Sequence, residues 1–443
     1  MAGMATSPSP ADGTSVRRIA GLALPALVVL AAEPLYVLVD TAVVGHLGGT
    51  ELGALALGGG VLTVIGFLGT VLAYGTTGRA ARRFGAGQRA AAVDEGVQAS
   101  WIALTAGVLV ALVAQFAAAP LTRTLAGSDG ELARSAAEWL RIASLGAPGI
   151  LLGMAGNGWM RGVQDTRRPM WYVLAGNAAS AVLCPVLVYP VGLGLVGSAI
   201  ANVVAQLLAG VLFVRALVVE RVPLAPHPAT VRRQLTVGRD LFLRGLAFQA
   251  CFLSAAAVAA RMGVATLGAH QIALQLWFFC ALVLDAVAIA AQSLVGATLG
   301  AGDAAGARHT ANRVARIGGA CGLLLGLLLA AGAVPLPTLF SADARVHEQA
   351  LVAWPWFVAM QPLAGVVFAL DGVLIGAGDV RYMRNLTLVA ALGFFLPAIW
   401  LAYALDLGLG GIWAGLTLFI VVRLLAMLAR VRGTRWAVAG ASR

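Results

Sequence analysis

Lysine is absent from this chain of 443 residues, and charged residues of every kind are scarce, at 11%. The basic residues are all arginine, 30 in number, against 19 acidic residues. Soluble domains carry about 25% charged residues, so this composition excludes an ordinary soluble protein. The hydrophobic content of 60% instead indicates an integral membrane protein.

Cysteine and histidine are also rare, at four and five residues. The cysteines stand singly in apolar runs, without a CxxC pair or metal-ligand spacing, so we expect no disulfide, metal site or cofactor. The histidines form no HExxH motif and lie mostly at the ends of apolar runs, which argues against a membrane enzyme. The net charge of +11 is explained by membrane topology, so we expect no nucleic-acid partner.

Apolar runs of about 20 residues recur from end to end, the length a helix needs to cross the bilayer. An outer-membrane barrel would show ten-residue alternating strands instead. The predicted fold is therefore an all-α polytopic membrane protein with twelve transmembrane helices in the lipid bilayer. The predicted spans are residues 19–45, 52–75, 92–118, 136–160, 169–190, 194–214, 239–260, 265–299, 311–333, 349–376, 385–404 and 408–429.

The arginines indicate the orientation of these spans. With the N-terminus inside, twenty-three arginines fall in inside segments and four in outside segments. Such a bias predicts that both termini are cytoplasmic and that the protein is a multi-pass protein of the cell membrane. The apolar run after Arg17 and Arg18 continues too far for a signal peptide, so an uncleaved first helix is expected.

The chain repeats itself at a nearly constant shift. LGGTELGALAL near residue 48 matches MGVATLGAHQI near residue 263, and RGVQDTRR (161–168) matches IGAGDVRY (375–382). Each copy has an even number of spans, so the two six-helix lobes are expected to be related by a pseudo-two-fold axis along the membrane normal, as in alternating-access transporters. The predicted divisions are an N-terminal tail (1–18), an N-lobe (19–214), a cytoplasmic linker (215–238), a C-lobe (239–429) and a C-terminal tail (430–443).

Asp40 lies in the apolar run PLYVLVDTAVVGHLGG, where a carboxylate costs about 2.5 to 3.5 kcal/mol on insertion scales. Glu33 and Tyr36 share its helix face, and such a stripe suits a cavity wall that accepts cations. The alternative is that both acids pair with buried arginines to lock the packing. Asp40 maps onto Ala255 in the second copy and Glu33 onto Phe248, so the acids are specific to the first lobe.

The other ionisable residues in the predicted spans are interpreted either as packing residues or as residues for which packing and function are both possible roles. Asp371 maps onto Asn157, and a role in the cavity and a role in packing are equally supported. Asp285 and His270 are likewise open between the two, with packing favoured for Asp285. Helical spacing predicts that Glu138 pairs with Arg141 and Asp240 with Arg244, and that Arg423 extends to the membrane interface.

Several of these segments resemble the multidrug and toxic compound extrusion (MATE) family, in its DinF-like branch: PLYVLVDTAVVGHLG, GNGWMRGVQDTRRPM, GLGLVGSAIANVVAQ, FLRGLAFQ and LGAHQIALQ. The resemblance implies an antiporter that exports organic cations or other amphipathic compounds in exchange for H⁺ or Na⁺. Because one chain contains both lobes, we expect it to function as a monomer. The resemblance places Asp40 at the ion-coupling position, Pro25 at the bend of the first helix, and Tyr36 and Asn157 in the cavity.

One departure from the family bears on the coupling ion. Relatives with a sodium site carry Asn, Asp and Thr where this chain has Ser180, Cys184 and Asn202. Loss of a hard oxygen ligand weakens a sodium site, so H⁺ is the predicted ion and Asp40 the predicted proton-coupling group. The full predicted substrate cavity comprises Glu33, Tyr36, Asn157, Asn177, Ser180, Asn202 and Asp371.

The sequence is also compatible with two alternatives to a proton-coupled exporter. A Na⁺-coupled antiporter of the same fold is one, and a lipid-linked precursor flippase is another. A flippase of that kind needs a strongly cationic cavity to hold a pyrophosphate, and Arg244 is the one buried cation predicted to serve.

Overall fold

The computed structural model describes residues 15–441, and every regular element within that range is a helix. Twelve helical stretches are long and apolar enough to span a membrane, which confirms the predicted fold class. Residues 1–14 of the predicted N-terminal tail and residues 442–443 at the other end lie outside the described residues.

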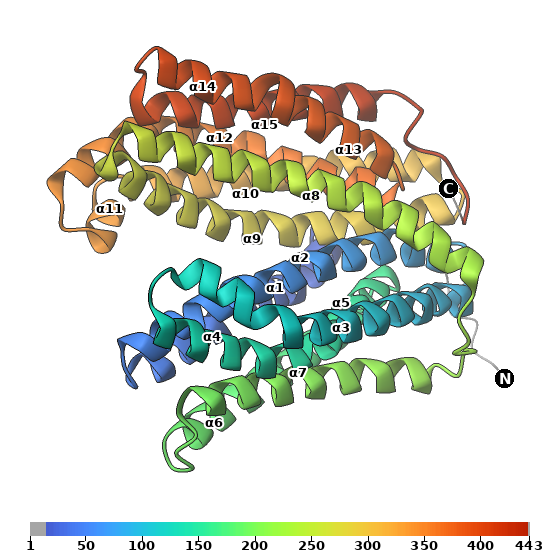
Figure 1. The fold of residues 1–443 in the computed structure, drawn as a ribbon. Coiled ribbons are helices and arrows are strands. Elements are labelled where there is room, and N and C mark those ends of the chain that lie inside the picture. The colour runs from blue at the N-terminus through green and yellow to red at the C-terminus, as the bar shows by residue number, and fades with distance from the viewer. Residues whose placement is uncertain (1–14, 442–443) are drawn as a thin grey trace. The chain divides into compact units, whose positions relative to one another are not determined.

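The helices run along the chain as Figure 1 labels them. The first half holds α1 (Val16–Gly45), α2 (Gly49–Gly85), α3 (Arg89–Ala126), α4 (Gly130–Ala143), η2 (Ser144–Gly146), α5 (Ala147–Gly162), α6 (Arg167–Val188) and α7 (Gly194–Val219). The second half holds α8 (Pro228–Met262), α9 (Val264–Gly300), α10 (Ala304–Ala331), α11 (Pro335–Phe340), α12 (Ala344–Gly376), α13 (Val380–Val389), η3 (Ala390–Phe395), α14 (Leu396–Ala404) and α15 (Gly408–Arg432).

Two of the predicted spans are interrupted near prolines. The fourth span changes from α4 to α5 through the single 3₁₀ turn η2, and Pro148 stands in the first turn of α5. The eleventh span widens into a π-helical turn, η3, immediately before Pro397. Proline has no N–H to donate to the carbonyl four residues earlier, so the regular α-helical bonding is interrupted there.

The chain separates into two compact units. One is Pro25–Gly238, and the other is Arg239–Arg443 together with the first helix up to Leu24. Because α1 is a single helix through Pro25, the division falls within that helix, at the proline that the sequence predicts as its bend. The C-terminal part of α1, with Asp40, belongs to the first of these units.

The internal repeat is visible in the packing of each unit. In the first, α5 packs against α2, α3 and α7, and in the second α12 packs against α9, α10 and α15. Gly158 and Gly372 are equivalent glycines on these central helices, and a Cβ at either would collide with a backbone carbonyl, of Ala73 or of Ala288. Glycine at these positions therefore lets the neighbouring helix backbones approach closely.

The turns repeat as well. Gly87 follows α2 with φ 75°, and its counterpart Gly302 follows α9 with φ 86°. This left-handed backbone carries little cost for glycine, so the segments GAGQ (85–88) and GAGD (300–303) are helix-ending turns.

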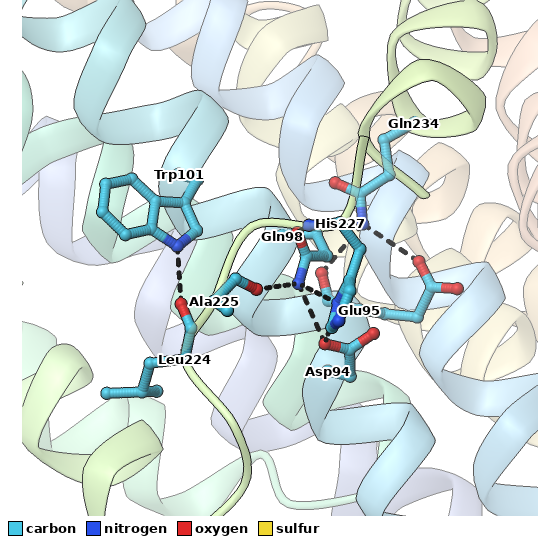
Figure 2. A network of polar contacts seen from close by, with 8 residues as sticks. All are labelled: Asp94, Glu95, Gln98, Trp101, Leu224, Ala225, His227 and Gln234. Atoms are coloured by element: carbon cyan, nitrogen blue, oxygen red, sulfur yellow. Dashed lines mark hydrogen bonds and ion pairs between the residues drawn. The ribbon is translucent and has the colours of Figure 1, made fainter. Parts of the chain in front are cut away.

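The segment between α7 and α8 is fastened to α3, as Figure 2 shows. Gln98 of α3 is fully buried and donates through Nε2 to the carbonyl of Ala225 at 3.0 Å, while its Oε1 accepts from the backbone N–H of His227 at 2.7 Å. Trp101, one turn on, donates through Nε1 to the carbonyl of Leu224 at 2.8 Å. Two side chains of α3 thus satisfy backbone groups of a connection that has no regular structure of its own.

The start of α8 is held to the same helix. Gln234 donates through Nε2 to Glu95 Oε2 at 2.9 Å, and Glu95 also accepts from Arg79 Nε of α2 at 2.8 Å. The first turns of α8 are therefore bonded within the first unit, and the predicted linker is partly helical.

We expect Gln98→Leu to loosen this connection. The substitution keeps the volume but leaves the N–H of His227 and the carbonyl of Ala225 without their partner, at about 1 to 3 kcal/mol. A loss of about 1.4 kcal/mol makes the locally opened form of the connection about ten times more populated. Trypsin cleaves that form, so cleavage after Arg221 should become about tenfold faster. Gln115→Leu, on α3 but bonded to the carbonyl of Arg141 at 3.0 Å, should cleave at the wild-type rate.

An unchanged cleavage rate in Gln98→Leu would mean that the connection is held by other contacts.

Candidate functional site

A pocket of about 430 Å³ lies within the first unit. Its walls are mostly apolar, with polar side chains contributed by several helices. A few convergent polar groups in an apolar pocket are typical of small-molecule sites. The side chains of interest are Glu33, Tyr36 and Asp40 from α1, Trp139 from α4, Met154 and Asn157 from α5, Asn177 from α6, and Asn202, Gln206 and Phe213 from α7.

Asp40 is 4% exposed and lines this pocket. Its Oδ1 accepts from the thiol of Cys184 on α6, with Sγ at 3.1 Å, and from the hydroxyl of Ser198 on α7, with Oγ at 2.8 Å. Within the described residues, these side-chain hydrogen bonds both end on Oδ1. Asp40 forms no ion pair with an arginine in that range. The geometry therefore does not support the alternative in which Asp40 pairs with a buried arginine to lock the packing.

Ser198 has a second partner. The indole Nε1 of Trp139 donates to Ser198 Oγ at 3.3 Å, so three side chains from α4, α7 and α1 are joined in series. Neither Ser198 nor Trp139 is among the predicted site residues. The signal for Ser198 was present, because it lies one helical turn before Asn202 and so shares its face.

Two amides of the opposite wall bond to α1, one at the side chain of Tyr36 and one at the backbone of Ala32. Asn202 donates through Nδ2 to the hydroxyl of Tyr36 at 2.7 Å, and Asn177 donates to the carbonyl of Ala32 at 2.9 Å. Asn157 donates within its own helix, to the carbonyl of Gly153 at 3.1 Å. Glu33 is exposed into the pocket. Asn177 and Asn202 thus hold the C-terminal part of α1 against α6 and α7.

Two predicted residues of the cavity lie elsewhere. Ser180 is fully buried on α6, one turn from Cys184, and is not part of the pocket wall. Asp371 lies on α12 of the other unit, where its carboxylate accepts from Arg244 Nη2 at 2.7 Å and from Arg423 Nη2 at 2.7 and 2.8 Å. Asp371 thus forms ion pairs with two arginines.

The prediction that Arg423 extends to the membrane interface is wrong. Its side chain is 2% exposed, and its guanidinium lies over the rings of Phe248 and Phe419, at 5.0 and 5.4 Å from their centroids. A carboxylate and two aromatic faces together offset the loss of water around the charge. Arg244, the cation weighed for a flippase, is paired in the same cluster.

The predicted pairs along single helices are wrong as well. Asp240 pairs with Arg384 of α13 at 2.6 Å and with its neighbour Arg239 at 3.1 Å, and Arg244 pairs with Asp371. Arg141 donates to the backbone carbonyl of Gln115 at 3.1 Å rather than to Glu138. These side chains instead bond to partners on neighbouring helices, and spacing along the sequence can predict only partners on the same helix.

His270 is buried at 3% exposure on α9, where its ring lies 6.0 Å from that of Trp413 on α15. It lies in the second unit and does not line the pocket around Asp40. Cys251 and Cys280 are buried there too.

Comparison with known proteins decides the family. The MatE family model matches residues 25–186 and 241–401, one stretch in each half. The chain belongs to the MATE family. Members of this family are transporters, so the expectation that the protein is not an enzyme is confirmed.

Individual relatives cover nearly the whole of this MATE protein. It is 33% identical to Protein DETOXIFICATION 44, chloroplastic, of Arabidopsis thaliana, over 97% of this chain and 84% of that protein. It is 32% identical to DNA damage-inducible protein F of Escherichia coli, over 92% of this chain and 90% of that protein. The second relative agrees with the predicted DinF-like branch.

A solved structure described as MATE in the bent conformation has the same fold. It superimposes with a TM-score of 0.87 at 22% identity and covers 98% of both chains. Together with the twelve apolar helices, these similarities show that the chain is a multi-pass membrane transporter.

Proposed function

We propose that this MATE protein is a multidrug efflux antiporter that exports amphipathic organic cations in exchange for H⁺, with Asp40 as the proton-coupling group. The observation that carries the proposal is a buried carboxylate in the wall of a largely apolar pocket, hydrogen-bonded by neutral donors. Multidrug transport is named for relatives, among them Multidrug and toxin extrusion protein 2 of Mus musculus and a multidrug resistance MATE transporter of known structure.

The groups around Asp40 support H⁺ as the proposed coupling ion. A sodium ion needs several hard oxygen ligands, and the side chains that hydrogen-bond this carboxylate supply one hydroxyl and one thiol. Sulfur is a poor ligand for hard cations. A single carboxylate is sufficient for a proton, so H⁺ is the proposed ion.

The proposed cycle uses the charge of Asp40. The carboxylate holds a cationic substrate in the pocket, and protonation removes the charge that binds it. Pro25 lacks one helical hydrogen bond, which makes a bend of α1 there inexpensive. Solved MATE structures are described in bent and in straight conformations, which supports a role for bending. We place both termini in the cytoplasm and the protein in the cell membrane, as a functional monomer.

Gradient-driven transport tests the proposal. Purified protein in liposomes should transport ethidium when only a pH gradient is imposed, and a sodium gradient alone should give no more than the leak of protein-free liposomes. Transport driven by sodium alone would reject the proton as the coupling ion.

A further inference from the structure

The hydrogen bonds from Trp139 through Ser198 to Asp40 have a fixed direction. An indole N–H can only donate, so Ser198 Oγ is the acceptor of the 3.3 Å bond from Trp139 Nε1. The hydroxyl has a single proton, and that proton is directed at Asp40 Oδ1, 2.8 Å away. Asp40 Oδ1 is therefore held as an acceptor.

This direction favours the charged form of Asp40. A hydrogen bond donated to a carboxylate stabilises the anion more than the neutral acid. If the indole were absent, the hydroxyl of Ser198 could turn and accept a bond from protonated Asp40. The indole N–H of Trp139 occupies one of the two lone pairs of Ser198 Oγ and so restricts this turning. Trp139 therefore acts on Asp40 without hydrogen-bonding to it.

The indole itself is fixed from the other side. A Cβ at Gly58 of α2 would collide with its six-membered ring, so the ring lies directly against the α2 backbone. Trp139 is 2% exposed and packs with Leu55 and Leu140. It also lines the pocket, so the group that orients Ser198 is part of the surface that a bound substrate contacts.

We propose that Ser198 and Trp139 are positioning residues that set the pH at which Asp40 exchanges its proton. This inference rests on the proposed function and adds to it the residues that tune the coupling site. The other titratable side chains facing this site are Glu33 and Tyr36 of α1 and Cys184 of α6; α2, α4, α5 and α7 contribute none to the pocket wall.

The test is the pH dependence of ethidium binding to the purified protein, measured by fluorescence anisotropy. Wild type binds the cation in the carboxylate form and loses it on protonation. Ser198→Ala removes a donor to the carboxylate, so the midpoint should move to higher pH by about one unit, a tenfold change in proton affinity. Ser198→Thr keeps the hydroxyl and should stay near the wild-type midpoint.

Trp139→Phe removes the group that orients the hydroxyl of Ser198 but keeps the hydroxyl itself. It therefore tests the orientation of the Ser198–Asp40 hydrogen bond separately from its presence. Ser198 can still donate to the carboxylate in this variant, but its hydroxyl turns more freely and accepts more readily from the acid, so we expect a smaller shift to higher pH. Gly58→Ala displaces the indole without changing either bonding group and should shift the midpoint in the same direction.

Wild-type midpoints in both Ser198→Ala and Trp139→Phe would overturn the inference, even if affinity or expression fell, because a purely structural role does not move a pH profile. Failure of the proposed function has a different signature, since wild type would then show no transport with the pH gradient alone.

Discussion

Asp40→Asn should abolish transport driven by a pH gradient. The amide cannot take up or release a proton, and it removes the charge that we propose holds a cationic substrate. In liposomes with an imposed pH gradient, ethidium transport by this variant should fall at least a hundredfold, to the leak of protein-free liposomes. The amide has nearly the volume of the carboxylate, and Cys184 and Ser198 can still donate to its oxygen, so the protein should fold.

Glu33→Gln is the matched control. It makes the same chemical change two turns away, on the same helix and in the same pocket, but without the buried surroundings of Asp40. Transport by this variant should remain dependent on the pH gradient, with weaker ethidium binding. If Asp40→Asn transports at the wild-type rate, or if both variants fail alike, the coupling role is not specific to Asp40.

The fold was predictable because its signals are local in the sequence. The length of the apolar runs locates twelve spans, and the shift between repeats anticipates that α5 and α12 occupy equivalent central positions. The breaks at η2 and η3 were not predicted. Pro148 and Pro397 were visible in the sequence, but proline is tolerated in transmembrane helices, and its presence does not say how the chain accommodates it.

The site was predictable only where one residue was unusual by itself. Asp40 is conspicuous as a charge in an apolar run, whereas Ser198 and Trp139 are ordinary residues that matter through contacts 158 and 59 positions away in sequence. The misassigned arginines have the same cause. Arg423 meets Asp371 across 52 positions, and helical spacing proposes partners only within about one turn.

Asp371→Asn should be among the most destabilising single substitutions in the second unit. Asp371 is buried between Arg244 and Arg423, whose guanidiniums also share the ring of Phe248 at 5.2 and 5.0 Å from its centroid. A neutral amide would leave two like charges there without a counter-ion. Breaking a buried ion pair in this way costs about 3 to 5 kcal/mol, which unfolding in detergent by denaturant titration should register.

Arg423→Met provides the comparison that separates charge balance from packing. It removes one of the two positive charges and fills much of the same volume, and it leaves Asp371 paired with Arg244 at 2.7 Å. The free energy of unfolding should therefore fall by about 1 to 2 kcal/mol only, because no buried charge is left unpaired. Both variants that fold should keep the wild-type pH dependence of ethidium binding, since Asp40 lies in the other unit. If Asp371→Asn were as stable as wild type yet lost transport, Asp371 would be a second ion-coupling group rather than the centre of a structural cluster, and its equivalence with Asn157 would mark a functional position in both lobes.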